Sequence, residues 1–398
     1  MRVLYLAPLL PAKSGSGGKR AVFNHLEELS SYATSINLVA VNIDDSLLEL
    51  PNEFLNNRFS SNSIEIFDRG IPRFHSKGGI TKAIKQLIFH YQPRAVTSAS
   101  PKRAKAFVKK LLKEYNYDYI LIDHLNAFGL LPFQRAKQKK ILIAHNIESN
   151  ILKDLISSKQ HSFVQKIRLL IELLKTIFYE NLAFFISDEV LFISSADLDY
   201  AKNNWNHKKF KVWPELLKPS PNFWSYKKTK EIVFVGSSNY FPNEDAILWL
   251  VNFLMRDLKS IDTSIKLRIV GSSAEQLSLD HELHSNIIFE GFVSDNELLE
   301  IQKNADLFIC PVTLGSGIKI KILEASSMGI PIAATPESLN GIGYLKNSAF
   351  VFSRSDLDIA IKISNLLNDQ IALNALSRSA LESLNNALKN RPRMINNY

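Results

Sequence analysis

Residues 310–333 read CPVTLGSGIKIKILEASSMGIPIA. The apolar run Leu307–Cys310 leads into this segment and predicts a buried strand, and a helix is expected at about 318–328. Pro331–Ala334 follow a Gly-Ile pair and predict a second strand. A strand, a glycine-containing loop, a helix and a further strand make up the βαβ unit from which parallel sheets are built.

The start of this helix carries two lysines, Lys319 and Lys321. Positive charge at a helix N-terminus opposes the helix dipole by about 0.3–1 kcal/mol, so a bound anion would offset the cost. Glu324 follows on the same helix face as Lys321, where its carboxylate can accept hydrogen bonds from sugar hydroxyls. Gly315-Ser-Gly317 alone describes an ordinary turn. Together with the lysines and Glu324 it favours a binding site for an anionic ligand.

The alternation of short apolar runs with helical patterns extends along the whole chain. Strands are expected first at Val3–Ala7, Asn37–Val41, Tyr119–Ile122, Lys140–Ala144 and Glu189–Ile193, and then at Ile232–Val235, Lys266–Val270, Ile287–Glu290, Leu307–Cys310 and Pro331–Ala334. Continuous Val, Ile and Leu strands separated by helices are typical of parallel sheets covered on both faces. The fold class is therefore α/β.

The length of 398 residues suits two domains. Residues 206–230 contain three prolines and seven lysines without a clear period, and we interpret them as the inter-domain connection, with its first part still attached to the first domain. The predicted organisation is a first domain at 1–215, a linker at 216–230, a second domain at 231–375 and a helical segment at 376–398, for which packing back on the first domain is one option. A cleft between the two halves is expected, lined by loops at the carboxyl ends of the strands.

Composition excludes several classes of protein. Gly and Pro number 15 each, which excludes a fibrous or low-complexity chain. The single cysteine, Cys310, cannot form an internal disulfide or a cysteine-based zinc cluster, so a cytoplasmic location is expected. No apolar run approaches the ~20 residues that a membrane-spanning helix needs. The run Val3–Leu10 is interrupted by Pro8 and is better interpreted as a strand than as a signal peptide.

Several segments, taken in chain order, resemble the retaining GT-B glycosyltransferases of the family 4 group. Besides residues 310–333, the segments that are similar to this family are His145–Ser149, Asp188–Asp197, Phe234–Asn243, Phe289–Val293 and Ala305-Asp306. The resemblance spans nearly the whole chain. It implies a GT-B fold, with two Rossmann-like domains facing each other across a cleft, the first binding the acceptor and the second binding a nucleotide-sugar donor.

The resemblance also implies roles for particular residues. The catalytic candidates are His145, Lys319, Lys321 and Glu324. The donor-binding candidates are Gly17, Gly18, Gly236, Ser237, Asn243, Phe292, Val293, Gly315, Ser316, Gly317 and Ile318. His124 and Glu148 are weaker candidates on the acceptor side. No acidic pair with metal-like spacing lies near the glycine loop, so no metal and no cofactor besides the nucleotide sugar is expected.

The sequence departs from this family at two points. Ser316 stands where many members carry a first glutamate, eight residues before the position of Glu324. Many members also place an arginine and a lysine just after the first strand of the second domain, but Gly236–Asn243 contains neither. Lys319 and Lys321 would then neutralise the donor phosphates. Transfer with retention, and electrostatic stabilisation of the departing diphosphate, are what the resemblance implies.

The net charge of +9 is concentrated in two stretches. One is the basic segment 206–230, and the other is 73–113, which contains eleven Lys or Arg and no acid. The apolar residues between 74 and 89 are spaced like one helical face, so residues 73–113 predict peripheral contact with an anionic membrane at its inner face, or equally a solvated basic face. A second amphipathic helix at 163–178 is interpreted as an ordinary face packed on the core.

The function predicted is transfer of a hexose-type sugar from a nucleotide sugar to a glycan or lipid-linked acceptor, in cell-surface polysaccharide biosynthesis. The alternative is a catalytically inactive GT-B-like protein that binds nucleotide or glycan, because Ser316 replaces an expected carboxylate. A Rossmann oxidoreductase would need a Gly-x-Gly-x-x-Gly turn, which neither glycine loop provides. No zinc-finger, basic-region or RNA-binding pattern is present, so no nucleic-acid partner is expected.

Overall fold

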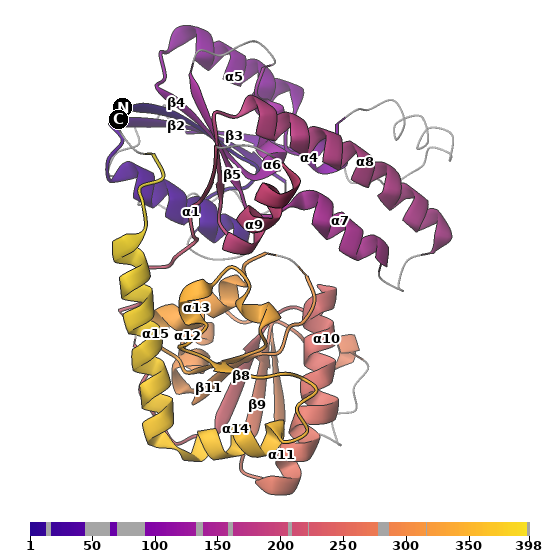
Figure 1. Cartoon of the computed structure of the whole chain (residues 1–398), viewed down its shortest axis with the longest axis vertical. Helices are drawn as coiled ribbons and strands as arrows, with labels where there is room; N and C mark the ends of the chain where they lie inside the picture. Colours follow the sequence, from indigo (N-terminus) through magenta and orange to yellow (C-terminus); the bar gives the residue numbers. More distant parts are fainter. Residues whose placement is uncertain are drawn as a thin grey trace. The chain divides into compact units, whose positions relative to one another are not determined.

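The computed structural model describes residues 1–12, 17–43, 64–69, 92–132, 138–157, 162–205, 209–221, 223–277, 286–315 and 317–395. Contacts within the chain separate two compact units. The first contains Met1–Trp213 together with Met394–Tyr398, and the second contains Pro214–Arg393. Each unit has its own sheet and its own core, and each is described by itself (Figure 1).

The described part of the first unit forms a seven-stranded parallel sheet in the order β3-β2-β1-β4-β5-β6-β7. Its strands are β1 (Arg2–Ala7), β2 (Ser35–Asn42), β3 (Ile64–Asp68), β4 (Tyr119–Asp123), β5 (Lys139–Ala144), β6 (Glu189–Phe192) and β7 (Phe210–Val212). Its helices are α1 (Gly17–Ser30), α4 (Arg94–Ser98), α5 (Lys102–Glu114), α6 (His124–Ala127), α7 (Glu148–Ser157), α8 (Phe163–Ile186) and α9 (Ser195–Asn204). Residues Val3–Ala7 are fully buried because β1 lies between β2 and β4, which explains the unbroken apolar run.

The described part of the second unit forms a six-stranded parallel sheet in the order β10-β9-β8-β11-β12-β13. Its strands are β8 (Glu231–Val235), β9 (Lys266–Val270), β10 (Ile287–Gly291), β11 (Leu307–Cys310), β12 (Ile332–Ala334) and β13 (Phe350–Val351). Its helices are α10 (Phe241–Trp249), which continues through a π-helical turn at Leu250–Leu254 into α11 (Met255–Ile261), and α12 (Asp295–Asn304), α13 (Ile320–Met328), α14 (Ile359–Asn368) and α15 (Gln370–Asn390). The α/β class with two parallel sheets is confirmed.

Both sheets reverse their strand order at a central pair of strands. In the first unit β1 lies beside both β2 and β4, and in the second unit β8 lies beside both β9 and β11. Loops that leave the carboxyl ends of such a pair diverge to opposite faces of the sheet, and ligands of open parallel sheets collect there. The loops after β1, β4, β8 and β11 are therefore the places to look for a site.

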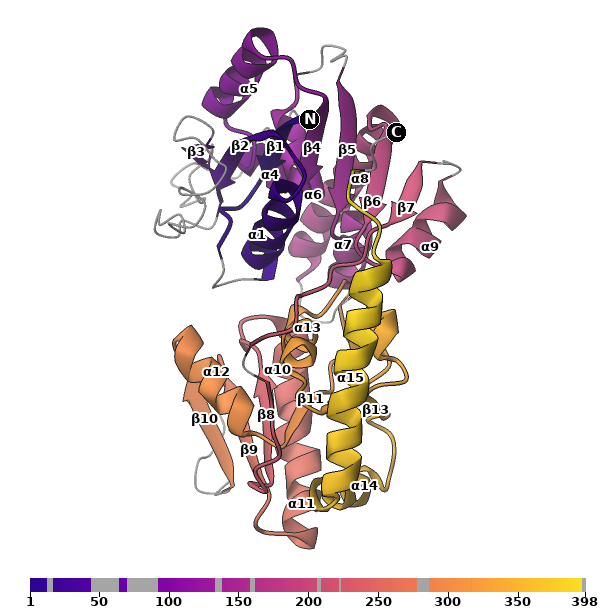
Figure 2. The ribbon, with the colours of Figure 1, turned by 90° about the vertical axis from the view of Figure 1, so that its left-hand side faces the viewer.

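The segment that leads into β8 packs on the second unit. The Trp224 indole is buried and donates a hydrogen bond to the carbonyl oxygen of Ala305, at 2.7 Å. The backbone N–H of Ser220 donates to the carbonyl oxygen of Ser327. On the same unit, α15 runs along α13 and α14 (Figure 2). Gly329, which ends α13 at a φ of +72°, leaves room for Leu381 of α15.

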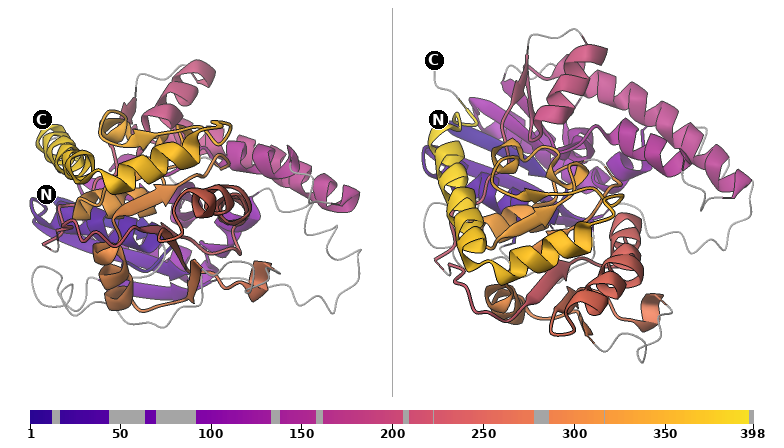
Figure 3. Two further views of the ribbon diagram at one scale, coloured as in Figure 1. Left: turned by 90° about the horizontal axis from the view of Figure 1, so that it is seen from below. Right: turned by 60° about the horizontal axis from the view of Figure 1, so that its bottom comes forward.

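The prediction that the second amphipathic helix buries its apolar face is wrong. α8 presents Phe163, Ile167, Leu170 and Leu174 with side chains 79%, 42%, 46% and 68% exposed. Its other face packs on the unit through Thr176, Tyr179, Ala183 and Phe184. Figure 3 shows α8 reaching beyond the sheet of its own unit beside α7. Among the described residues, no helix combines the length and the apolarity that crossing a membrane requires.

Candidate active site

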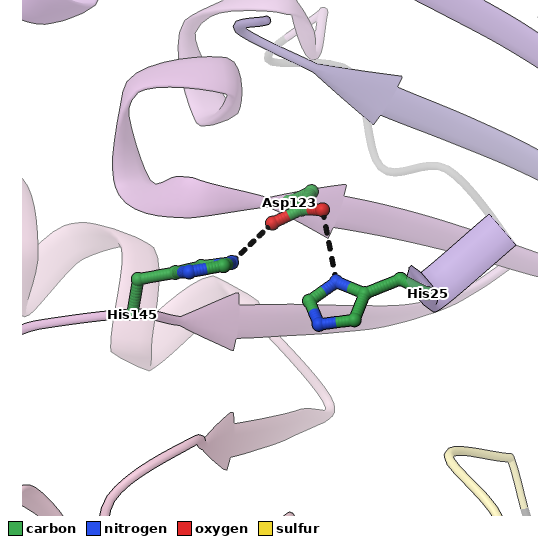
Figure 4. A group of neighbouring side chains, drawn as sticks. All are labelled: His25, Asp123 and His145. Atoms are coloured by element: carbon green, nitrogen blue, oxygen red, sulfur yellow. Dashed lines mark hydrogen bonds and ion pairs between the residues drawn. The ribbon is translucent and has the colours of Figure 1, made fainter. Parts of the chain in front are cut away.

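Asp123 ends β4 and is the centre of a buried polar cluster in the first unit. Its Oδ1 lies 2.6 Å from Nε2 of His145, and its Oδ2 lies 3.1 Å from Nδ1 of His25 (Figure 4). The hydroxyl of Tyr5 also donates a hydrogen bond to Oδ2. The four residues come from β1, α1, β4 and the loop after β5, so the parallel order of the sheet brings them together.

His124 is the fifth residue of this cluster and contacts both His145 and Asp123. Its ring stacks on the ring of His145, with the centroids 3.5 Å apart and the planes at 10°. Its Nδ1 lies 2.8 Å from Oδ1 of Asp123. The backbone of His124 has a φ of +65°, in the left-handed region that residues with a side chain rarely adopt. Such strain is found where the surrounding structure fixes a side chain for a purpose, here the placing of an imidazole over His145.

The charge state of the cluster follows from burial and from the neighbours. Burial alone would raise the pKa of Asp123, but the imidazoles, that of His145 first, hold its pKa well below the ordinary value. Burial and the nearby His124 lower the pKa of His145 to about 4, against the pull of Asp123. His145 is therefore neutral at pH 7. Because an ionised carboxylate only accepts hydrogen bonds, Nε2 of His145 carries the hydrogen and Nδ1 is left as an acceptor.

His25 and Tyr5 were not predicted as site residues. His25 lies on the buried face of α1 with its ring edge-on to Trp213, and a histidine at such a position looks like an ordinary core residue in the sequence. Ligand atoms of His25, Asp123 and His145 lie within 4.8 Å of one another, a spacing that could hold a metal ion. Both oxygens of Asp123 already accept hydrogen bonds, so the group is also complete without one.

The loop after β5 is fixed by two carboxyl groups. Glu148 begins α7 and is half-buried, and burial raises its pKa. Glu180 of α8 is buried and accepts hydrogen bonds from the backbone N–H of Glu148, at 2.9 Å, and from Oγ of Ser149, at 2.6 Å. Burial raises the pKa of Glu180 to about 7. Glu180 thus caps the N-terminus of α7, three residues after His145.

Gly17 and Gly18 are the first residues of α1. A Cβ atom on Gly18 would lie 2.7 Å from Cδ1 of Leu9 and 3.9 Å from Nε2 of His124. The structure therefore places Gly18 near His124, and a side chain at this position would require Leu9 to move. Gly15, which precedes them in the same loop, lies outside the described residues.

Lys321 is the centre of a second cluster, in the second unit. Its Nζ donates a hydrogen bond to Oδ1 of Asn243, at 2.7 Å, and lies 4.5 Å from the centroid of the Phe234 ring. Nδ2 of Asn243 donates in turn to the carbonyl oxygen of Ser237, at 3.0 Å. Burial lowers the pKa of Lys321 to about 8, so its ammonium group is still charged at pH 7.

Gly236 makes this arrangement possible. A Cβ atom there would lie 2.7 Å from Nζ of Lys321 and 2.8 Å from Cγ of Asn243. The loop after β8, the N-terminus of α10 and the N-terminus of α13 therefore meet at one place. Four predicted residues, Gly236, Ser237, Asn243 and Lys321, are brought together there.

Lys319 holds the glycine loop, residues 311–319, in shape. Its Nζ donates to the carbonyl oxygens of Gly315, at 2.9 Å, and Gly317, at 3.1 Å. Both glycines have a positive φ, +82° and +83°, so the loop bends in a way that disfavours side chains. The helix expected from 318 begins at Ile320 because Lys319 takes an extended, N-capping conformation. Ser316 lies outside the described residues.

The remaining predicted donor residues belong to the second unit. Ile318 is partly buried and packs on the core of the second unit, and Glu324 lies half-buried on α13. Phe292 and Val293 follow β10, which is separated from β8 by β9. Val293 packs on the core while the Phe292 ring is 74% exposed. An exposed aromatic ring at a strand end can stack on a planar group such as a nucleobase.

Comparison with known proteins identifies a family domain and a relative. Residues 229–369 match the family model of glycosyl transferases group 1. An uncharacterized 44.6 kDa protein in the cps region of Klebsiella pneumoniae is 24% identical over 404 residues, which cover 94% of this chain and 95% of the relative.

Solved structures resemble the whole chain. A mutant of S. aureus TarM, in complex with fondaparinux, alpha-GlcNAc-glycerol and UDP, has a TM-score of 0.67 at 10% identity, covering 98% of this chain and 97% of that chain. Anabaena Alr3699/HepE in complex with UDP-glucose has a TM-score of 0.61 at 14% identity, covering 97% of this chain and 95% of that chain. Identities this low establish the fold alone, and the predicted GT-B architecture of two Rossmann-like domains is confirmed.

Proposed function

We propose that this chain is a glycosyltransferase that moves a sugar from a nucleotide-sugar donor to a glycan or lipid-linked acceptor, with retention of configuration. The glycosyl transferases group 1 match over residues 229–369 supports glycosyl transfer. The relative in a cps region supports a place in polysaccharide biosynthesis. TarM and HepE were solved with UDP or UDP-glucose, which supports a nucleotide-sugar donor of that kind. We assign donor binding to residues 231–375 and acceptor binding to residues 1–215.

The observation that carries this proposal is the cluster around Lys321. Two helices, α10 and α13, begin beside the half-buried Lys321, whose ammonium group lies against Gly236, and the glycine loop supplies further backbone N–H groups. Helix N-termini and a desolvated ammonium group are suited to a diphosphate. As the bond to the sugar breaks, negative charge grows on the diphosphate, and the fixed positive charge of Lys321 stabilises it.

Lys321 supplies charge of the kind that a divalent cation supplies in other transferases, which supports a reaction that needs no metal. Glu324 is the carboxylate that would bind hydroxyls of the transferred sugar. Ser316 stands in place of the first glutamate of the resemblance, so one donor-sugar contact in this chain is made by a hydroxyl or is lost. The nucleobase would stack on the exposed ring of Phe292.

In the first unit, the role proposed for His145 is contact with the transferred sugar. Its Nε2–H is engaged by Asp123, so Nδ1 is the ring atom that can accept a hydrogen bond from a sugar hydroxyl. Asp123 acts through His145 and is a positioning residue. His124 and Glu148, which lie beside His145, are assigned to the acceptor side.

A cytoplasmic location, with peripheral contact to an anionic membrane through residues 73–113, stays a prediction. Residues 73–91 lie outside the described part of the chain. In the described part, α5 buries Ala104, Val108 and Leu111 and exposes Lys102, Arg103, Lys109, Lys110 and Lys113. An exposed basic face of this kind fits both interpretations of the stretch.

A panel of UDP-, GDP- and ADP-sugars tests the proposal. We expect at least one of them to raise the melting temperature of the wild type, because a ligand that binds only the folded state stabilises it. The same donor should then be consumed by the wild type and far more slowly by Glu324→Ala. Stabilisation without turnover on any acceptor would favour the catalytically inactive binding protein. No stabilisation by any donor would contradict the proposal.

A further inference from the structure

α8 carries an exposed apolar stripe, interrupted between Phe178 and Phe185 by the exposed Asn181. The stripe consists of Phe163, Ile167, Leu170, Leu174, Phe178 and Phe185, each between 42% and 79% exposed. At ~100° per residue these six positions fall within about 80° of the helix circumference, and at ~1.5 Å per residue they extend over about 33 Å. Soluble proteins seldom expose six large apolar side chains on one helix face, so the stripe indicates a partner.

The acidic and basic side chains of α8 lie on different sides of the helix. Both of its acidic residues face the protein: Glu172 accepts a hydrogen bond from the backbone N–H of Arg94, and Glu180 accepts from Glu148 and Ser149. Its basic residues are Lys166, Arg168 and Lys175, of which Arg168 is exposed and the others half-buried. The outward side of the helix is therefore apolar and cationic.

An apolar helix face can bind a lipid surface, a second copy of the chain or another protein. The lysine and arginine side chains beside the stripe help to decide among these partners. An interfacial helix buries an apolar face at the boundary between head groups and acyl chains, while flanking lysines and arginines attract anionic head groups. A second copy of the chain would bring like charges together along two paired stripes, which opposes association. Charge complementarity therefore favours a lipid surface.

We infer that α8 is the surface by which this protein docks on an anionic membrane, with its apolar stripe at the level of the acyl chains. α8 is also tied to the candidate active site, because Glu180 caps the helix that begins three residues after His145. A sugar acceptor anchored in the membrane would then be presented near the His145 loop. This last part rests on the proposed function, whereas docking itself does not.

Flotation with lipid vesicles tests the inference on the full chain, without donor or acceptor. The probes are vesicles of phosphatidylcholine and phosphatidylglycerol in equal parts, and vesicles of phosphatidylcholine alone. We expect the wild type to float with the anionic vesicles and Leu170→Glu/Leu174→Glu to bind them about tenfold or more weakly, since two carboxylates then oppose both insertion and the head-group charge. Lys166→Gln/Arg168→Gln/Lys175→Gln should lose the preference for anionic vesicles.

A matched control is Leu357→Glu/Ile371→Glu, which places the same two charges at exposed apolar positions of the second unit. This variant should float like the wild type. An equal loss in both double variants would overturn the inference, because added charge alone would then explain the effect. Wild type that does not float, but forms a dimer which Leu170→Glu/Leu174→Glu dissociates, would also overturn it in favour of a second copy.

Insertion of the stripe can be measured directly with Leu174→Cys labelled with an environment-sensitive dye. The dye labels this position selectively because the single native cysteine, Cys310, is buried. We expect rapid labelling in solution and a blue shift of emission when anionic vesicles are added. Slow labelling without vesicles would mean that another part of the chain covers the stripe, and would overturn the inference. Donor hydrolysis in solution is measured separately, so failure of the proposed function and failure of docking are distinguishable.

Discussion

Nε2 of His145 lies 2.6 Å from Oδ1 of Asp123, and both side chains are buried. The same carboxylate also accepts hydrogen bonds from His25 and Tyr5, so three donors stabilise its ionised form. A charge buried in this way fixes the orientation and the tautomer of His145 without being exposed to a ligand itself.

The first prediction concerns Asp123→Asn. The amide keeps the shape of the side chain but loses the charge and presents an N–H₂ group, so His145 loses its fixed tautomer. We expect turnover to fall about 100-fold, as for the loss of about 3 kcal/mol, while KM for the donor changes little. Steady-state kinetics measure both. Asp118→Asn, at an exposed carboxylate that accepts from the backbone of Arg2, is the control. A rise in KM alone would contradict a positioning role.

The second prediction concerns Gly236→Ala. The added methyl group would lie 2.7 Å from Nζ of Lys321 and must displace it. We expect donor affinity to fall about tenfold or more, with secondary structure unchanged, because a charge-assisted contact is worth about 1.5–3 kcal/mol. Gly343→Ala is the matched control, since a Cβ atom there meets no heavy atom within 4 Å. Calorimetric titration with the donor compares the two. Equal affinities would remove Lys321 from the donor site.

The third prediction follows from the pKa of Lys321, which burial lowers to about 8. The side chain is a cation below that pH and becomes neutral above it. We therefore expect kcat/KM for the donor to fall as the pH rises through about 8, because kcat/KM reports on the free enzyme. Lys321→Gln should be slow at pH 7 and should approach the wild type above pH 9. A ratio of the two that does not change with pH would contradict the assignment.

The fourth prediction concerns stability and Glu180. Burial raises its pKa from 4.5 to about 7, so between these values the folded protein binds more protons than the unfolded chain, and stability falls as the pH rises. The lowered pKa of His145, about 4, has the opposite effect up to about pH 6.5. Comparing the wild type with Glu180→Gln cancels the histidine contribution.

We expect the stability of the wild type relative to Glu180→Gln to fall by about 2.4 kcal/mol between pH 5 and pH 7.5. Urea unfolding at the two pH values gives the difference. A relative stability that rises between pH 5 and pH 7.5 would mean that Glu180 is stabilised as a carboxylate by the N-terminus of α7.

Much of the fold was predictable because buried parallel strands are continuous apolar runs. β1, β8 and β11 are central strands, and their runs stand out in the sequence. β3, β7 and β13 were not predicted. Each is an edge strand and is short or only partly buried, so its pattern is weak.

The site residues that were predicted stand in short segments that resemble a known family. Lys321 and Glu324 stand in a recognisable strand-loop-helix, and Lys319 does too, although the structure shows its ammonium group binding the carbonyl oxygens of its own loop. His25 could not be found in this way because it reaches Asp123 only through the pairing of β1 with β4. The α8 stripe was misread because periodicity shows that a face is apolar but not what covers it.

The most direct test of the account is the release of nucleoside diphosphate from a panel of UDP-, GDP- and ADP-sugars. It is followed for the wild type, Lys321→Gln and Gly343→Ala, with and without a membrane extract as source of acceptor. The account predicts release from at least one donor by the wild type and by Gly343→Ala, and release at least about tenfold slower by Lys321→Gln. No release from any donor, or equal rates in the wild type and Lys321→Gln, would contradict it.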